Sequence, residues 1–172
     1  MNGDARDNRR YRDPKESRLK FKLDKAAGLY KVDRILPKGQ RFPFNFGFIP
    51  RTQVADGDPI DVLLILDEIL FPGCCLDCRL LGVVYAEQSE KGKTYRNDRI
   101  LAVSIKDPDA PRALNELERN FIENAERFFA SYHAAEGNQF KVLGVGNPEK
   151  AFELVRQTTV RVDGARDERR DR

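Results

Sequence analysis

Val54-Ala-Asp-Gly-Asp-Pro-Ile-Asp-Val-Leu-Leu64 contains three aspartates within six positions and leads directly into an apolar segment. Close carboxylates repel one another, and each loses hydration when it is drawn toward a strand. A hard divalent cation bound through oxygen ligands would balance these charges. Asp-Gly-Asp-Pro is also typical of a turn, which accounts for Asp56 and at most Asp58. It does not account for Asp61, which interrupts a buried-strand pattern, so we favour a metal or phosphate-linked site.

The segments on either side of this stretch have the patterns of β-strands. Leu19–Asp24 and Leu29–Ile35 alternate apolar and polar residues around a turn at 26–28, which predicts a β-hairpin. Residues 41–49 are aromatic at every second position, as in a strand or extended segment with one face packed inward. Further strands are predicted at 60–66, 76–86, 99–105 and 139–145. The first hundred residues are therefore predicted to be all-β.

Two helices are predicted in the last third of the chain. In residues 111–134 apolar side chains recur at helical spacing, with Asp109 as the N-cap and Gly137 beyond the end. A second helix is predicted from Pro148 through about Thr158. Strands first and helices later indicate an α+β, mainly β protein, built as a closed or partly closed barrel with helices packed outside.

Charge is concentrated at the two ends of the chain. Residues 1–18 hold six basic and four acidic side chains, and residues 161–172 hold five and four. Both ends are poor in apolar residues, so we predict a disordered leader (1–18), one domain (19–160) and a disordered tail (161–172). The remaining body has 20 basic and 20 acidic residues, which argues against a nucleic-acid binder.

Other features of the sequence indicate the cellular compartment. The sequence has no apolar run long enough for a membrane span and no secretory apolar stretch near Met1, so we expect a cytoplasmic protein with no membrane partner. Cys74, Cys75 and Cys78 contain one Cys-x-x-Cys spacing, but a zinc or redox site lacks a second cysteine pair and a nearby histidine. We interpret the three as small, mostly buried strand residues of a reducing compartment.

Asp56-Gly-Asp-Pro-Ile-Asp61-Val resembles the signature of the soluble, magnesium-dependent inorganic pyrophosphatases. Upstream, Lys20-Phe-Lys-Leu-Asp-Lys, Gly28-Leu-Tyr-Lys-Val-Asp-Arg34 and Phe42-Pro-Phe-Asn-Phe-Gly-Phe-Ile49 resemble strands of that family in order and spacing. Downstream, the resemblance continues through Pro72-Gly73, Leu81-Gly-Val-Val84, Leu101-Ala-Val103 and Phe128-Phe-Ala-Ser-Tyr132. It covers roughly residues 19 to 160. It implies a five-stranded, OB-like closed β-barrel with flanking C-terminal helices, assembled as a homo-oligomer, with a hexamer favoured.

The resemblance also implies a reaction, the hydrolysis of inorganic pyrophosphate to two phosphates with Mg²⁺, or Mn²⁺, as cofactor. By position, Asp56, Asp61 and Asn97 would be metal ligands, and Asp58 would accept the proton of the attacking water. The substrate is strongly anionic and needs cations and hydrogen-bond donors around it. The positions that would bind it are Lys20, Arg34, Arg99, Tyr132 and His133.

Several positions depart from the family pattern around the phosphate site. Phe46 stands where a tyrosine usually donates its hydroxyl to phosphate, and Phe42 replaces its aromatic neighbour, so both positions lose a donor. His133 stands where a lysine usually follows Tyr132, and imidazole is shorter and only partly charged near neutral pH. A glutamate expected before Lys20 has no counterpart, because Tyr11 stands at its position.

The candidate metal ligands also depart from the family pattern. Asn97-Asp98-Arg99 matches an Asp-x-Lys of the family, so Arg99 keeps the cation and Asn97 is a neutral ligand that weakens Mg²⁺ binding. Asp98 could substitute only if the strand slips by one residue. A second acidic ligand falls in a loop of different length, where Glu87 or Glu90 could serve.

These departures leave three hypotheses open. The first is a pyrophosphatase of full or reduced rate, which the intact aspartate triad favours. The second is a hydrolase of the same fold that acts on another phosphate compound. The third is a catalytically weak homologue that binds metal or phosphate. A nucleic-acid binder rests on the barrel type alone and is the weakest reading.

Overall fold

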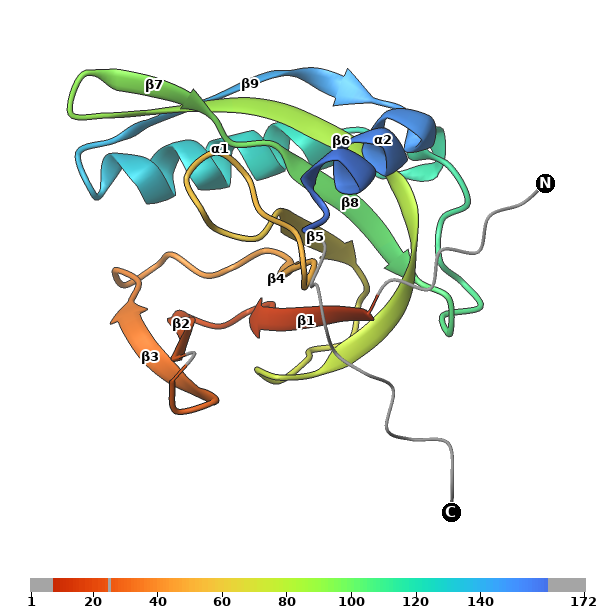
Figure 1. Ribbon diagram of the computed structural model, residues 1–172, viewed down its shortest axis with the longest axis horizontal. Helices are drawn as coiled ribbons and strands as arrows, with labels where there is room; N and C mark the ends of the chain where they lie inside the picture. The colour runs from red at the N-terminus through yellow and green to blue at the C-terminus, as the bar shows by residue number, and fades with distance from the viewer. Residues whose placement is uncertain (1–7, 25, 161–172) are drawn as a thin grey trace.

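The computed structural model describes residues 8–24 and 26–160. Strands are the main regular structure of the first hundred residues, and both α-helices come later in the chain (Figure 1). The strands are β1 (Asn8–Asp13), β2 (Leu19–Asp24), β3 (Leu29–Ile35), β4 (Asn45–Phe48), β5 (Asp61–Ile65), β6 (Cys75–Glu90), β7 (Lys93–Arg96), β8 (Arg99–Ser104) and β9 (Gln139–Gly146). The helices are a 3-10 turn η1 (Leu114–Glu116), α1 (Phe121–Ala134) and α2 (Pro148–Thr158).

The strands form a seven-stranded sheet and a separate two-stranded sheet. The larger sheet has the order β1-β4-β5-β8-β6-β7, with β9 also paired to β6 and β1 paired to both β4 and β6. The β5–β8 pair is parallel. Strands β2 and β3 form the smaller sheet as an antiparallel hairpin. The protein is therefore mainly β with two α-helices, as predicted, whereas the closed barrel stays a prediction.

The hairpin and the second helix coincide with their predicted residues, but the first helix is shorter than predicted. It begins at Phe121, and Asp109 is not its N-cap. The segment before it contains η1, and its residues Leu114 and Leu117 pack against the hydrophobic cluster beneath α1. Their helical spacing therefore reflects burial of an irregular segment. Within the described residues, no helix combines the length and apolar character needed to cross a membrane.

Part of the predicted leader belongs to the fold. Strand β1 lies in it, and its last residue, Asp13, has only 1% of its surface exposed. The Asp13 carboxylate accepts a hydrogen bond from the Phe21 N–H at 2.7 Å and contacts the Arg12 guanidinium at 3.2 Å. Residues 8–18 were predicted to be disordered, but they contain strand β1, and the charges of Arg12, Asp13 and Lys15 have partners in the fold. Residues 1–7 and the predicted tail, 161–172, lie outside the described residues.

The strands observed within 41–49 and around 76–86 differ in length from the predicted segments. Only β4 forms in the first segment, and the second is part of the longer β6, which bends along its course (Figure 1). The cysteines that precede or begin β6 differ in exposure. Cys78 is buried, Cys74 is half-buried and Cys75 is exposed. The prediction of mostly buried cysteines is thus confirmed for Cys78 and wrong for Cys75.

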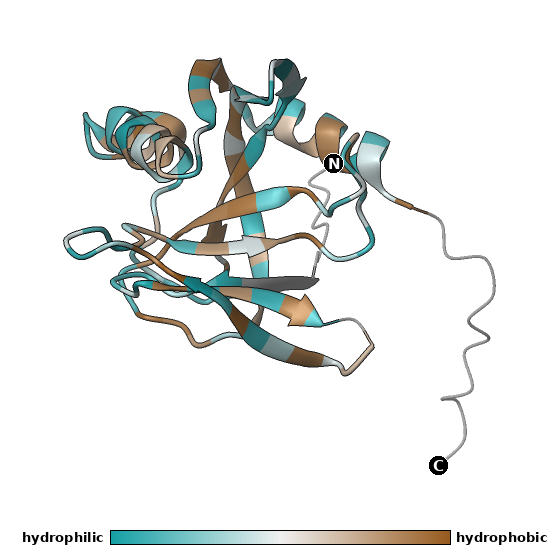
Figure 2. Cartoon of the chain, turned by 90° about the vertical axis from the view of Figure 1, so that its left-hand side faces the viewer, coloured by the Kyte–Doolittle hydropathy of each residue, from teal (hydrophilic) through white to brown (hydrophobic). Residues whose placement is uncertain are grey.

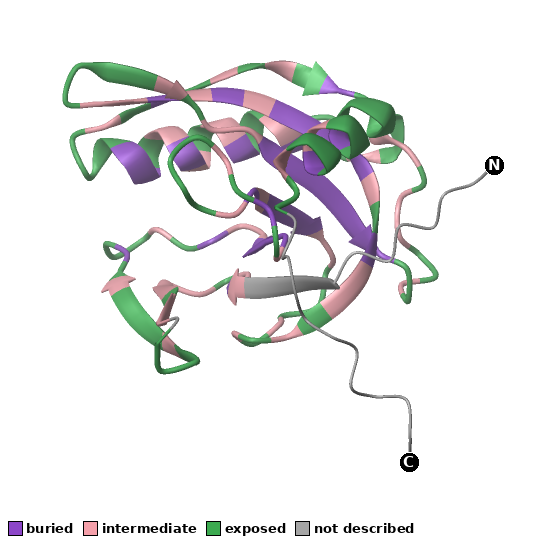
Figure 3. Ribbon diagram, in the orientation of Figure 1, coloured by how far each residue is buried: buried purple, intermediate pink, exposed green. Residues whose placement is uncertain are grey.

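Strand β8 lies between two hydrophobic clusters, and all of its residues are buried (Figure 3). Ile100 and Ala102 belong to one cluster, while Leu101 and Val103 belong to the other. Helix α2 contributes to the first cluster and α1 to the second, so the two helices pack on opposite faces of the sheet. Figure 2 shows hydrophobic and hydrophilic residues following one another along the strands. Residues on the two faces of β8 therefore hold the helices that border the candidate site.

Candidate active site

A pocket of about 650 Å³ brings all of the predicted site residues together. They come from the hairpin, the loop before β5, the starts of β5 and β8, and the C-terminal half of α1 (Figure 1). The set comprises Lys20, Arg34, Asp56, Asp58, Asp61, Asn97, Arg99, Tyr132 and His133. Side chains from distant parts of the sequence thus surround one cavity.

The acidic loop is both a turn and part of the pocket. Gly57 has φ +88°, and the Asp58 N–H donates to Asp56 Oδ1 at 2.9 Å, which is the self-capped turn expected for this sequence. Asp56 and Asp58 are exposed on that turn. Asp61 is half-buried and begins β5. The turn and the candidate metal site therefore coexist in this segment.

Thr52 ties together the two ends of the acidic loop. Its buried hydroxyl donates to the Ile49 carbonyl at 2.6 Å and accepts from the Ile60 N–H at 2.9 Å. Because both partners are backbone groups, the loop ends are held regardless of the side chains between them. The sequence carried no signal for this role, since Thr52 lies outside the acidic motif.

Sheet register places charges next to each other. Asp61 is the Cα partner of Arg99 in the parallel β5–β8 pair, and Lys20 is the Cα partner of Arg34 in the hairpin. The Tyr132 ring lies beneath both hairpin cations, with Lys20 Nζ 5.3 Å and Arg34 Cζ 5.2 Å from its centroid. These distances fit cation–π contacts. The hairpin therefore presents two cations to the pocket against a fixed aromatic surface.

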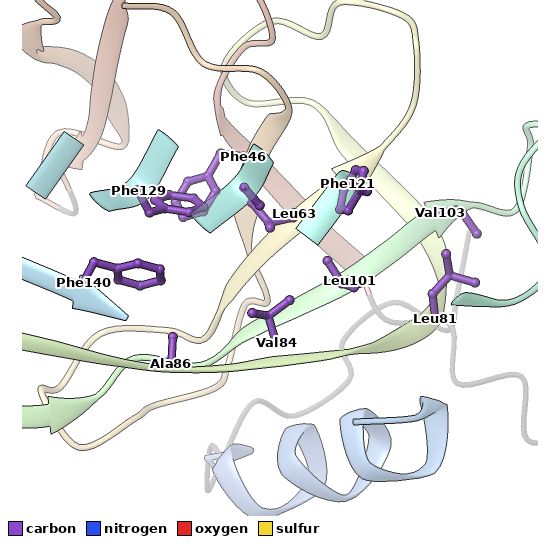
Figure 4. Close-up of a cluster of buried hydrophobic side chains, with 11 residues drawn as sticks. Phe46, Leu63, Leu81, Val84, Ala86, Leu101, Val103, Phe121, Phe129 and Phe140 are labelled. Atoms are coloured by element: carbon purple, nitrogen blue, oxygen red, sulfur yellow. The ribbon is translucent and has the colours of Figure 1, made fainter. Parts of the chain in front are cut away.

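Arg99 is a buried cation held between aromatic rings. Its side chain lies over Phe129 at 4.1 Å and Phe140 at 4.5 Å, and these rings belong to the cluster drawn in Figure 4. One guanidinium nitrogen donates to the Asn97 carbonyl at 2.8 Å, and Nε has no hydrogen-bond partner among the described residues. Burial lowers the pKa of Arg99 to about 10, and Asp61 opposes this effect. Arg99 stays charged at neutral pH, with unused hydrogen-bonding capacity.

His133 is neutral in this pocket. It is 6% exposed, stacks on Phe140 with 5.4 Å between ring centroids, and lies edge-on to Tyr132. Burial lowers its pKa to about 3, and the nearby cations, Arg99 first, add to the effect. Among the described residues neither ring nitrogen has a hydrogen-bond partner. The imidazole therefore acts as a neutral donor or acceptor, and the sequence-based expectation of partial charge is wrong.

One end of the Asn97 side-chain amide already has a hydrogen-bond partner. Its Nδ2 donates to Gln88 Oε1 at 2.6 Å. This bond fixes the amide orientation and leaves Oδ1 as the atom able to meet a cation. Of the two alternative acidic ligands, Glu90 lines the pocket, whereas Glu87 is not among the lining residues.

Asp98 is used in the structure of the β7–β8 turn. Its Oδ1 accepts from the Ala86 N–H at 3.0 Å, and both of its oxygens contact the Arg96 guanidinium. No one-residue slip of β8 occurs, because Arg99 pairs in register with Asp61. Asp98 lines the same pocket as Asn97, but its carboxylate is already engaged in these contacts.

The comparisons with known proteins agree with this geometry. A model of the inorganic pyrophosphatase family matches residues 13–163. The chain belongs to the inorganic pyrophosphatase family. It is 32% identical to the inorganic pyrophosphatase of Synechocystis over 146 residues, covering 84% of each chain. The inorganic pyrophosphatase structure from Thermus thermophilus superimposes with a TM-score of 0.80 at 28% identity, covering 92% of each chain.

Plant members of the family are also similar but longer. Soluble inorganic pyrophosphatase 5 of Arabidopsis thaliana is 40% identical over 144 residues. The match covers 82% of this chain and 64% of the plant protein. The chain thus spans somewhat less than two thirds of the length of that relative.

Arg12 and Asp13 are pocket residues that the sequence analysis missed. Arg12 Nη2 contacts Asp61 Oδ1 at 3.4 Å, Nε contacts Asp13 at 3.2 Å, and Cζ lies 5.1 Å from the Phe46 ring centroid. Burial raises the pKa of Asp13 to about 6, although Arg12 opposes this effect. The signal that could have found them was the family's glutamate position at Tyr11, which implied that this segment reaches the site.

The pyrophosphatase family implies a divalent metal ion, generally Mg²⁺. Asp56, Asp61 and Asn97 all line the pocket and offer oxygen atoms, the donor type that Mg²⁺ prefers. Within the described part of the chain, no group of three or more acidic, histidine or cysteine side chains is arranged to hold a metal ion. The donors fit Mg²⁺ in chemical type, as two carboxylates and one neutral amide.

Proposed function

We propose that this pyrophosphatase-family chain hydrolyses inorganic pyrophosphate to two phosphates in a reaction that depends on Mg²⁺, which Mn²⁺ could replace. One observation carries the proposal. A single pocket gathers the three aspartates together with Lys20, Arg34 and Arg99. Pyrophosphate has high negative charge and small size, and catalysis of phosphoryl transfer consists mainly of positioning and charge stabilisation. A cavity with cations and carboxylates around it suits that task.

The proposed roles of the cations follow from how each is held. Lys20 and Arg34 lie on the hairpin above Tyr132 and would bind oxygens of one phosphate. Arg99 would bind another oxygen with its guanidinium, whose Nε has no hydrogen-bond partner among the described residues, and its fixed position between two rings limits the entropy cost of binding. Tyr132 and neutral His133 would add uncharged hydrogen bonds.

The proposed roles of the aspartates follow from the conformation of the acidic loop. Asp58 is exposed and is the candidate to accept the proton of the attacking water. Asp56 accepts the Asp58 backbone N–H, which fixes the Asp56 carboxylate against the backbone of Asp58. Bound by Asp56, Asp61 and Asn97, Mg²⁺ would neutralise phosphate charge and acidify a water molecule.

Phosphate release from pyrophosphate, measured across Mg²⁺ and Mn²⁺ concentrations, tests this function. Asp58→Asn should lower the rate by about 10²-fold or more, because removal of a general base has an effect of this size. The matched control is Asp67→Asn, which removes an exposed carboxylate that pairs with Lys15 outside the pocket. Full activity in Asp58→Asn would refute the assigned role. A panel of phosphoesters and nucleotides would identify a different substrate if one of them is hydrolysed faster.

Finer features of the family are proposed here as well. The pairing of β1 with both β4 and β6 supports a five-stranded OB-like barrel formed by β1, β4, β5, β8 and β6. We also propose a cytoplasmic homo-oligomer, with a hexamer favoured. Exposed apolar side chains such as Phe71 and Leu29 suit burial in a subunit interface. Light scattering after size-exclusion chromatography would measure the assembly.

A further inference from the structure

Arg12 occupies the position of a counter-ion beside a proposed metal ligand. Its Nη2 lies 3.4 Å from Asp61 Oδ1, and the two side chains are 23% and 21% exposed. An ion pair with this degree of burial is shielded from solvent more than a surface pair is. The negative charge of Asp61 is therefore already balanced in the folded chain.

The structure holds Arg12 in this place through two further contacts. Its Nε contacts Asp13, whose carboxylate is buried and is anchored by the Phe21 N–H at 2.7 Å. Its guanidinium lies over the Phe46 ring at 5.1 Å. The ordering of the Arg12 side chain is thus achieved during folding, which lowers the entropy cost of its contact with Asp61.

A divalent ion and the Arg12 guanidinium compete for the Asp61 carboxylate, of which Arg12 contacts Oδ1. Metal ligation uses lone pairs of Asp61 at a distance of about 2.0–2.1 Å for Mg²⁺. It would also place two positive charges close to the guanidinium, which is unfavourable at this separation. Binding of the ion through Asp61 Oδ1 would therefore require the Arg12 contact to break or lengthen.

We propose that Arg12 is a resident counter-ion of Asp61 which a divalent metal ion must displace, so that Arg12 weakens metal binding at this carboxylate. The proposal rests on the role of Asp61 as a metal ligand in the proposed function. It adds a named cause for weak metal binding besides the neutral side chain of Asn97. Once displaced, the guanidinium stays in the pocket as an additional group for an anionic ligand.

Direct metal binding in the absence of pyrophosphate tests the proposal. Calorimetric titration with Mn²⁺ should show about tenfold tighter binding to Arg12→Gln than to the wild type, a factor that corresponds to ~1.4 kcal/mol. The matched control is Lys15→Gln, because Lys15 also pairs with an aspartate, Asp67, but does not line the pocket. Equal tightening in Lys15→Gln would mean a net-charge effect and would overturn the proposal.

A second variant protects the test against misfolding. Arg12→Gln leaves Asp13 buried without its cation, so the pair Arg12→Gln, Asp13→Asn is measured as well. Asparagine keeps an oxygen for the Phe21 N–H, and the double variant has the net charge of the wild type. Tighter Mn²⁺ binding in this variant supports the proposal. Affinity within about twofold of the wild type in both Arg12 variants would overturn it.

A thermodynamic cycle locates the effect at Asp61. In an Asp61→Asn background, Arg12→Gln should no longer tighten Mn²⁺ binding, because the contested carboxylate is absent. The same tightening with and without Asp61 would overturn the proposal. These titrations contain no substrate, so a failure of pyrophosphate hydrolysis would leave their result unaffected.

Discussion

The free energy of unfolding of Asp13→Asn, relative to that of the wild type, should increase as the pH rises from about 4 to about 7. Burial raises the pKa of Asp13 from 3.8 to about 6 in the folded chain. Between these two values the folded protein binds a proton that the unfolded chain has already released. The stabilising contribution of this group is therefore fully present below pH 3.8 and is lost as the pH rises through about 6. Asparagine does not titrate, so the variant lacks this loss.

The size of the effect follows from the difference between the two pKa values. At ~1.36 kcal/mol per pKa unit, a pKa of about 6 in place of 3.8 corresponds to about 3 kcal/mol in the free energy of unfolding. Asp13→Asn also removes the charge that Arg12 contacts. In the wild type the effect of this contact is already part of the Asp13 pKa, and in the variant the asparagine does not titrate. The informative quantity is thus the change with pH in the difference between variant and wild type.

Urea unfolding at constant ionic strength and at several pH values from 4 to 7 measures this difference. The variant should gain up to about 3 kcal/mol over the wild type across the range. Asp67→Asn is the matched control, because it removes a fully exposed carboxylate with the same chemical change. A difference that is flat with pH, or that moves against the variant, would refute the assignment of a buried, raised-pKa carboxyl.

Two further predictions concern packing and the buried cation. Gly82→Ala should lower the free energy of unfolding by about 1–3 kcal/mol, since a Cβ there would lie 2.5 Å from the Gly146 carbonyl oxygen. Urea unfolding measures this change. The control is Gly144→Ala, where nothing lies within 4 Å of the added Cβ, and its stability should stay closer to that of the wild type. Arg99→Met should leave the free energy of unfolding within about 1 kcal/mol of the wild type or raise it, because a buried charge is removed. The same variant should lose phosphate release at least about tenfold, and unchanged activity would contradict the role of Arg99.

Some parts of the fold could be predicted because their signals are local. The β2–β3 hairpin has alternating strands and a turn ending in Gly28, which has φ +65°. Helix α2 begins at a proline, and Asn147 caps it by accepting the Lys150 N–H at 3.0 Å. The start of α1 was not predictable in this way. Leu114 and Leu117 have helical spacing, but tertiary packing and not an α-helix determines their burial.

In the candidate site, too, the sequence indicates some residues and not others. Asp56, Asp58 and Asp61 could be found because three carboxylates stand close together in the sequence. The contact of Arg12 with Asp61 was missed, since it joins residues 49 positions apart and the indication was limited to the family's glutamate position at Tyr11. The neutral state of His133 also depends on rings and cations from other elements. Chemistry carried by one segment is visible in a sequence, whereas electrostatic environments made by several segments are not.

The parallel pairing of β5 with β8 has a consequence for how this site can diverge. Asp61 and Arg99 are register partners at the beginnings of two strands whose following residues are buried. A shift of either strand by one residue would turn its whole apolar set to the wrong face, so the core itself preserves this charged pair. The β6–β7 connection has no such constraint. Substitutions and length changes can therefore accumulate around the pocket. The Asp61–Arg99 pair at its centre is kept, because the stability of the sheet depends on the same strand register.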